Sequence, residues 1–233
     1  MLTKKAARLA EKEFRKRQTR DGYPWWAQLL LVPLWWCVIV LAGFALWHFP
    51  MEFLNTGSGW AFLGGAVLGL VVFPHLPMRP AYVFGHEMTH WLAAKLTFHK
   101  TGRIHLGMTE GYVEVMDSSG FIVLAPYIIP FYFLFSECLL AFAIQVWRQA
   151  PPYFCNAGFG WLGATYAYHV VLTRIALKNG QKDMEYCGRF LSYCIILAGN
   201  VVFLFLTLLI VSPRPLVSLK SVIRAFQVFW EGL

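Results

Sequence analysis

Long apolar runs, separated by short polar stretches, dominate the chain. Residues 25–47 contain no Asp, Glu, Lys or Arg, and this run exceeds the roughly 20 residues that a helix needs to cross a bilayer. Further apolar runs cover 60–76, about 81–98, 119–147, 156–177 and 190–211. Backbone polar groups in hydrocarbon need internal hydrogen-bond partners, so these runs are predicted to be helices. None of them shows the alternation of polar and apolar residues that is typical of an outer-membrane strand. The pattern predicts an all-α polytopic membrane protein with about six transmembrane helices.

One stretch, 103–117, has a different pattern. Ile104, Leu106 and Met108 alternate with polar or small residues, and the turn-like Thr109-Glu110-Gly111 follows them. This arrangement predicts a short β-hairpin after the third apolar run. Its exposed edge would either hold an unwound substrate segment by backbone hydrogen bonds or form a surface loop of no catalytic interest.

Prolines and polar residues interrupt the later runs. Pro126 and Pro130 predict a kink or local unwinding of the fourth run, which either lines a substrate cavity or is a plain kink. Residues 178–189 form a polar link that carries the turn signal Asn179-Gly180.

The composition supports a membrane protein, because 58% of the residues are hydrophobic and only 14% are charged, against roughly a quarter charged in soluble domains. The net charge of +8 gathers largely near the N-terminus. A basic cluster beside a first span favours a cytoplasmic location and attraction to anionic lipid, and nothing else indicates nucleic acid. We therefore expect a cytoplasmic basic segment over 1–22, followed by a multi-pass transmembrane domain over 23–233.

The cysteines carry little information. They are odd in number and form no C-x-x-C pair, and several lie in apolar runs, where cysteine usually acts as a small hydrophobe. Neither a disulfide framework nor a thiolate zinc site is expected.

The third apolar run contains the motif His86-Glu87-Met88-Thr89-His90. Residues four apart share one face of a helix, so both imidazoles can reach one metal ion. Zn²⁺ suits neutral imidazole and lowers the pKa of bound water, and Glu87 is placed to act as general base. Ionisable residues within a membrane segment are expensive and by default functional.

A catalytic zinc usually takes three protein ligands, and this motif supplies two. The metzincin pattern is absent, because Leu96 stands where its third histidine would be and Ala93 replaces its turn glycine. A distant carboxylate is the alternative, with Asp183, Glu185 and Glu137 as candidates.

With HExxH in a membrane segment and a later aspartate, the chain resembles the site-2 protease family of intramembrane zinc metalloproteases. The resemblance implies that His86, His90 and Asp183 hold zinc, that Glu87 activates water, and that the substrate is a transmembrane helix of another membrane protein. Two departures are visible: Asp183 stands in Gly180-Gln181-Lys182-Asp183-Met184 instead of L-D-G or N-P-D-G, and no PDZ domain is inserted.

Other polar residues in apolar runs have both functional and structural interpretations. His169 and His75 are proton relays, extra ligands or packing histidines, and Asn156 and Asn200 orient substrate or join helices.

Three rival functions remain open. They are a membrane metal transporter, an inactive family member acting as a scaffold, and a prenyl-protein protease that uses a glutamate as third ligand.

Overall fold

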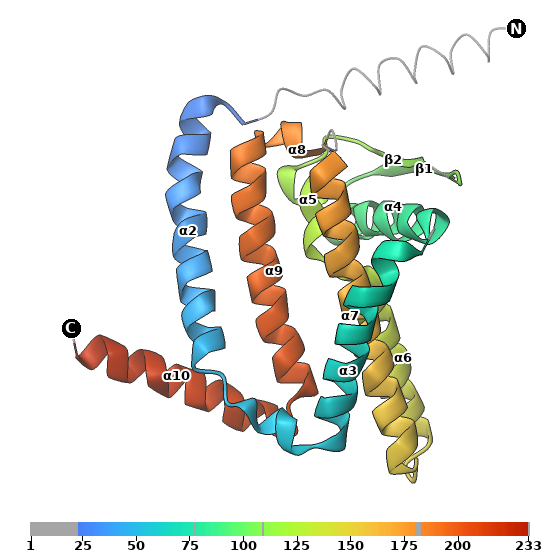
Figure 1. Cartoon of the computed structure of the whole chain (residues 1–233). Coiled ribbons are helices and arrows are strands. Elements are labelled where there is room, and N and C mark those ends of the chain that lie inside the picture. Colours follow the sequence, from blue (N-terminus) through green and yellow to red (C-terminus); the bar gives the residue numbers. More distant parts are fainter. Residues whose placement is uncertain (1–22, 77, 109, 180–182, 233) are drawn as a thin grey trace, which may run out of the picture.

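The computed structural model describes residues 23–76, 78–108, 110–179 and 183–232 (Figure 1). The predicted basic segment 1–22 lies outside these residues. The elements in chain order are α2 (Trp25–Trp47), η1 (Met51–Asn55), α3 (Gly57–Val72), η2 (Phe73–His75), α4 (Arg79–Leu96), β1 (Thr101–Leu106), β2 (Gly111–Val115), α5 (Gly120–Ile128), α6 (Phe131–Val146), α7 (Pro152–Asn179), α8 (Asp183–Tyr186), α9 (Arg189–Val211) and α10 (Pro215–Glu231). The described chain is therefore mostly helical, with one short hairpin, as predicted.

Three helical stretches are long and apolar enough to cross a membrane. They are Trp25–Asn55, Gly57–His75 and Arg189–Val211, and the bent pair of α5 and α6 brings the number to as many as four. The prediction of about six spans is thus met only in part. The third and fifth apolar runs form α4 and α7, but charged and titratable residues within these helices reduce their apolar content.

The proline-containing fourth run breaks as predicted. Helices α5 and α6 meet at 66°, with Pro126 inside α5 and Pro130 immediately before α6. Proline lacks a backbone N–H and its ring crowds the preceding turn, so a single straight helix is disfavoured here. At the other end of α5, Ser119 accepts a hydrogen bond from the backbone N–H of Ile122 and caps the helix.

The predicted hairpin is present as an antiparallel pair of β1 and β2. Ile104 pairs with Val113 and Leu106 with Gly111, with an irregularity between Thr101 and Ile104. Strand β2 packs on α4, and its buried valines join a core cluster with residues of α4 and α5. That cluster contains Ala93, Ala94, Val113, Val115, Ile122 and Ala125.

Helices α3 and α7 pack closely along each other through small residues. A Cβ added at Gly65 would lie 1.9 Å from the carbonyl oxygen of Gly160, and one at Gly163 would lie 1.9 Å from that of Phe62. Small residues let helix backbones approach in this way within membranes. The close contact fixes the position of α7 relative to α3, the helix that precedes α4.

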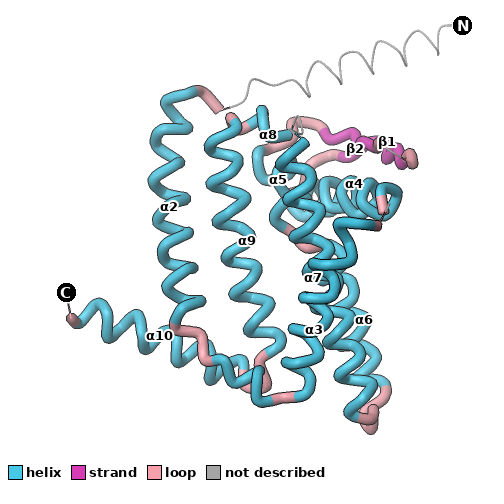
Figure 2. The backbone as a smooth tube through the Cα atoms, in the orientation of Figure 1, coloured by secondary structure: helices cyan, strands magenta, loops and turns pink. Residues whose placement is uncertain are grey.

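The two ends of the helix bundle differ. Figure 2 shows α8 and the hairpin at the end where α2 begins, and α10 with the C-terminus at the other end. The backbone N–H of Tyr23 donates to the carbonyl of Tyr186 at 3.3 Å, which ties the start of α2 to α8. Figure 1 shows α4 lying crosswise to α2 and α9, near the α8 end.

Candidate metal centre

Helix α4 holds two histidines side by side. Because His86 and His90 are one turn apart, their Nε2 atoms come within 3.2 Å of each other. The Nδ1 of His90 lies 2.8 Å from the carbonyl oxygen of Ile122. A carbonyl can only accept, so this nitrogen carries the proton and the Nε2 lone pair is left free for a metal.

Asp183 approaches both imidazoles from the start of α8. Its Oδ2 lies 3.4 Å from His86 Nε2 and 3.8 Å from His90 Nε2, and the hydroxyl of Tyr127 donates to the same oxygen at 2.8 Å. Burial raises the pKa of the Asp183 carboxyl, but its interactions with His86 and His90 outweigh burial and hold the pKa below its usual value. Asp183 is therefore ionised, which is the form that binds metal.

The spacing of the three groups suits zinc. One ligand atom from each of His86, His90 and Asp183 lies within 4.8 Å of the others. Two ligand atoms on a tetrahedral Zn²⁺ are roughly 3.4 Å apart, given bonds of about 2.0–2.2 Å. The separations of 3.2, 3.4 and 3.8 Å lie close to that value. Three such ligands leave a fourth position for water or substrate.

Glu87 lies on α4 next to His86, and its side chain is close to the hairpin. Its side chain is only 6% exposed, and its carboxyl interacts electrostatically with His90 and Asp183. The start of β2 covers it, since a Cβ added at Gly111 would lie 2.8 Å from Cγ of Glu87. The hairpin therefore packs against the Glu87 side chain.

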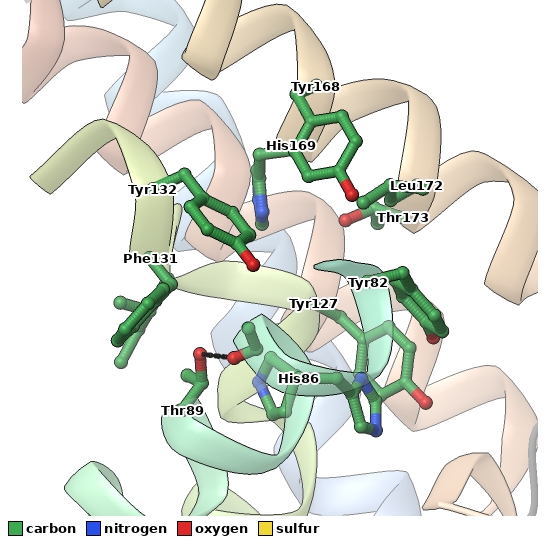
Figure 3. Close-up of a pocket in the computed structure, with 13 residues that line it drawn as sticks. Tyr82, His86, Thr89, Tyr127, Phe131, Tyr132, Tyr168, His169, Leu172 and Thr173 are labelled. Carbon is green, nitrogen blue, oxygen red and sulfur yellow. Dashed lines mark hydrogen bonds between the residues drawn. The ribbon is translucent and has the colours of Figure 1, made fainter. Parts of the chain in front are cut away.

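A small cavity of about 30 Å³ lies beside His86 (Figure 3). Such a volume is sufficient for a water molecule, which needs about 10–15 Å³ by this measure. Its lining includes four tyrosines and Pro126 of the proline break. The tyrosines are Tyr82, Tyr127, Tyr132 and Tyr168.

The other carboxylates considered as ligands lie elsewhere. Glu185 is exposed and pairs with Arg189 at 3.0 Å, and Glu137 is not part of the group formed by the two histidines and Asp183. Among the described residues, this group is the one cluster of at least three metal-ligating side chains.

The remaining polar residues make contacts between helices. His169 of α7 lies 3.2 Å from Oδ1 of Asn200 in α9, and the amide of Asn200 donates to the carbonyl of Tyr127 at 2.7 Å. Asn156 accepts a hydrogen bond from Ser58 at 2.9 Å. His75 is exposed in η2. These hydrogen bonds join α7 to α9, α9 to α5 and α3 to α7.

Three parts of the site were not identified from the sequence: the Tyr127 hydroxyl, the Ile122 carbonyl and the Tyr82 side chain. For Tyr82 a signal was present, because it precedes His86 by four residues and so shares its helix face. Tyr127 lies within the proline break, where no local periodicity marks a contact to a residue far along the chain.

No known protein family, curated protein or solved structure matches this chain.

Proposed function

We propose that this chain is an intramembrane zinc metalloprotease that hydrolyses a peptide bond in or near a transmembrane segment of another membrane protein. The convergence of His86, His90 and Asp183 from α4 and α8 is the observation that carries the proposal. Its spacing fits Zn²⁺, and a buried glutamate follows the first histidine. These are the parts of a metal-assisted hydrolase.

In this proposal His86, His90 and Asp183 hold the zinc. When bound, Zn²⁺ supplies a Lewis acid that lowers the pKa of water and polarises the scissile carbonyl. Glu87 accepts a proton from the attacking water and later gives it to the leaving amine. Tyr127 and the Ile122 carbonyl orient Asp183 and His90 through the hydrogen bonds described above.

The membrane setting rests on the apolar helices and on charge. We infer that the basic N-terminal segment stays in the cytoplasm, so the α8 end of the bundle faces that side. Helix α7 packs along the apolar α3 and would cross the bilayer with it, whereas the crosswise α4 would lie at the cytoplasmic end without crossing. The number of crossings would then fall slightly below the six expected from the sequence.

The substrate class follows from the resemblance to site-2 proteases and from the surroundings of the site. A peptide bond inside a helix is covered by its own hydrogen bonds, so the substrate segment must unwind locally. The strand edges of the hairpin, which packs against Glu87, offer backbone groups for an unwound segment. The partners are then the lipid bilayer and a membrane protein with a transmembrane helix.

The test uses purified full-length protein reconstituted in liposomes with a panel of single-span peptides. We expect wild-type protein to bind about one zinc and to cleave within an apolar segment. Glu87→Gln should retain zinc and lose cleavage by about 100-fold or more, because glutamine keeps the shape but cannot accept a proton. Glu185→Gln is the matched control, since Glu185 is exposed and outside the cluster.

Other outcomes would identify the rival functions. Zinc flux into liposomes without cleavage would indicate a transporter. Zinc binding with neither flux nor cleavage would indicate a scaffold. Wild-type cleavage rates in Glu87→Gln would exclude the general-base role.

A further inference from the structure

The four tyrosines around the cavity beside His86 differ in one respect. The hydroxyl of Tyr127 donates to Asp183, that of Tyr132 to the carbonyl of Ala81, and that of Tyr168 to the carbonyl of Met78. The hydroxyl of Tyr82 is buried and has no hydrogen-bond partner among the described residues. Buried polar groups are nearly always paired, so an unpaired hydroxyl next to a reactive centre calls for an explanation.

Tyr82 is held next to the metal centre by the helix that carries it. It precedes His86 by one turn of α4, and the two rings lie 5.3 Å apart between centroids. In Figure 3 the rings of Tyr82 and Tyr127 lie beside the imidazole of His86. Since the hydroxyl of Tyr127 is engaged by Asp183, Tyr82 is the cavity tyrosine whose O–H is free to donate to a reacting group.

We propose that Tyr82 is a catalytic residue whose hydroxyl donates a hydrogen bond to the carbonyl oxygen of the scissile peptide bond as negative charge develops on it. The proposal rests on the protease function above. A preorganised donor aimed at the developing charge stabilises the transition state more than the ground state. The missing partner of the hydroxyl is then supplied by the substrate.

The step can be written with every group accounted for. Water oxygen bonds to the carbonyl carbon and releases a proton to Glu87, while the carbonyl π electrons move to the oxygen that Tyr82 faces. The electrons then return, the C–N bond breaks, and Glu87 passes the proton to the amine nitrogen. The products are a carboxylic acid and an amine, and Tyr82 keeps its own proton throughout.

The first test compares Tyr82→Phe with wild type in the zinc-loaded, reconstituted protein. Loss of one such donor lowers kcat by about 100- to 1,000-fold in other hydrolases, and we expect a loss of this size. KM, zinc content and melting temperature should stay near the wild-type values, because the hydroxyl pairs with no described residue of the folded protein.

The second test measures binding and needs no turnover. A peptide with a tetrahedral phosphinate in place of the scissile bond imitates the developing oxyanion, so its affinity should fall in Tyr82→Phe by a factor similar to the loss in kcat. The affinity for an uncleaved peptide of the same sequence should change little.

Tyr168→Phe is the matched control, because its hydroxyl lines the same cavity but pairs with a backbone carbonyl of the loop before α4. We expect it to lower the melting temperature and to keep the ratio of phosphinate to peptide affinity. Wild-type kcat and phosphinate affinity in Tyr82→Phe would overturn the proposal while leaving the protease function standing. A wild-type protein that cleaves no peptide would overturn both.

Discussion

Helices α2 and α4 come from the first and third apolar runs, yet they differ in which side chains they bury. Among the residues of α2 only Ala45 is buried, and large apolar side chains such as Trp25 and Leu30 are exposed. In α4 the buried residues include Glu87 and Thr89, whereas Phe84 and Leu96 are exposed.

A helix that is apolar on every side is suited to an apolar solvent, and α2 fits that description. In α4 the carboxylate of Glu87 is buried, whereas the large apolar side chains of Phe84 and Leu96 are exposed, which is unlike a soluble surface helix. Burying a charge is expensive unless it is paired or bound to a metal. Under the proposed function, α2 would border lipid, while α4 would retain its polar groups to hold the metal.

The largest effect is expected from removing Asp183, the proposed acidic ligand of the metal held by α4. The Asp183→Asn variant keeps the shape of the side chain and loses its charge. Groups that only hydrogen-bond to a metal ligand typically contribute about 10- to 100-fold to metal affinity, and a directly bound ligand contributes more. We expect zinc affinity to fall by more than about 100-fold, measured by competition with a chelator of known affinity. Glu185→Gln should bind zinc like wild type. An unchanged affinity in Asp183→Asn would remove Asp183 from the ligand set.

A smaller effect is expected from the hydroxyl that orients this ligand. Tyr127→Phe removes the 2.8 Å hydrogen bond to Asp183 without touching the imidazoles. Zinc affinity should fall by about 10-fold, the lower end of what such orienting groups contribute. Tyr132→Phe is the comparison, since its hydroxyl pairs with the backbone of α4, and it should leave zinc affinity unchanged. Equal losses in both variants would point to general damage to the fold.

Local sequence patterns predicted the parts of the structure that depend on near neighbours. The run 25–47 coincides with α2, and 190–211 differs from α9 by one residue at its start. The proline break and the hairpin were also predicted. The helical spacing of His86 and His90 made their approach predictable, because four residues bring side chains onto one face.

The features that were missed depend on distant contacts or on mixed composition. Helix α10 combines Lys220 and Arg224 with apolar residues, so a search for uncharged runs passes over it. The crosswise position of α4 and the hydrogen bond from Tyr127 to Asp183 are set by tertiary packing, which leaves no periodicity in the sequence. The need for a third ligand left Asp183, Glu185 and Glu137 as candidates, and only order and spacing relative to a known family favoured Asp183.

The last prediction compares a glycine of α2 with a glycine of the hairpin that packs on α4. Gly43 lies in α2 with nothing within 4 Å of an added Cβ, whereas a Cβ at Gly111 would lie 2.8 Å from Cγ of Glu87 and 2.9 Å from the carbonyl oxygen of His105. A backbone carbonyl cannot easily move aside, so Gly111→Ala should lower the free energy of unfolding by about 1–3 kcal/mol. Gly43→Ala should raise it slightly, by up to about 1 kcal/mol, because alanine favours a helix over glycine.

Both glycine variants are measured by thermal unfolding in the same detergent, followed by cleavage in liposomes. Because the methyl group at position 111 would press on Glu87, Gly111→Ala should also slow cleavage while zinc stays bound. If Gly43→Ala were the more damaging of the two, α2 would be packed against protein and not lipid, and the difference between the two helices would disappear. If Gly111→Ala were neutral in stability and in cleavage, the hairpin would be free to move away from Glu87, and its proposed role beside the substrate would lose its structural basis.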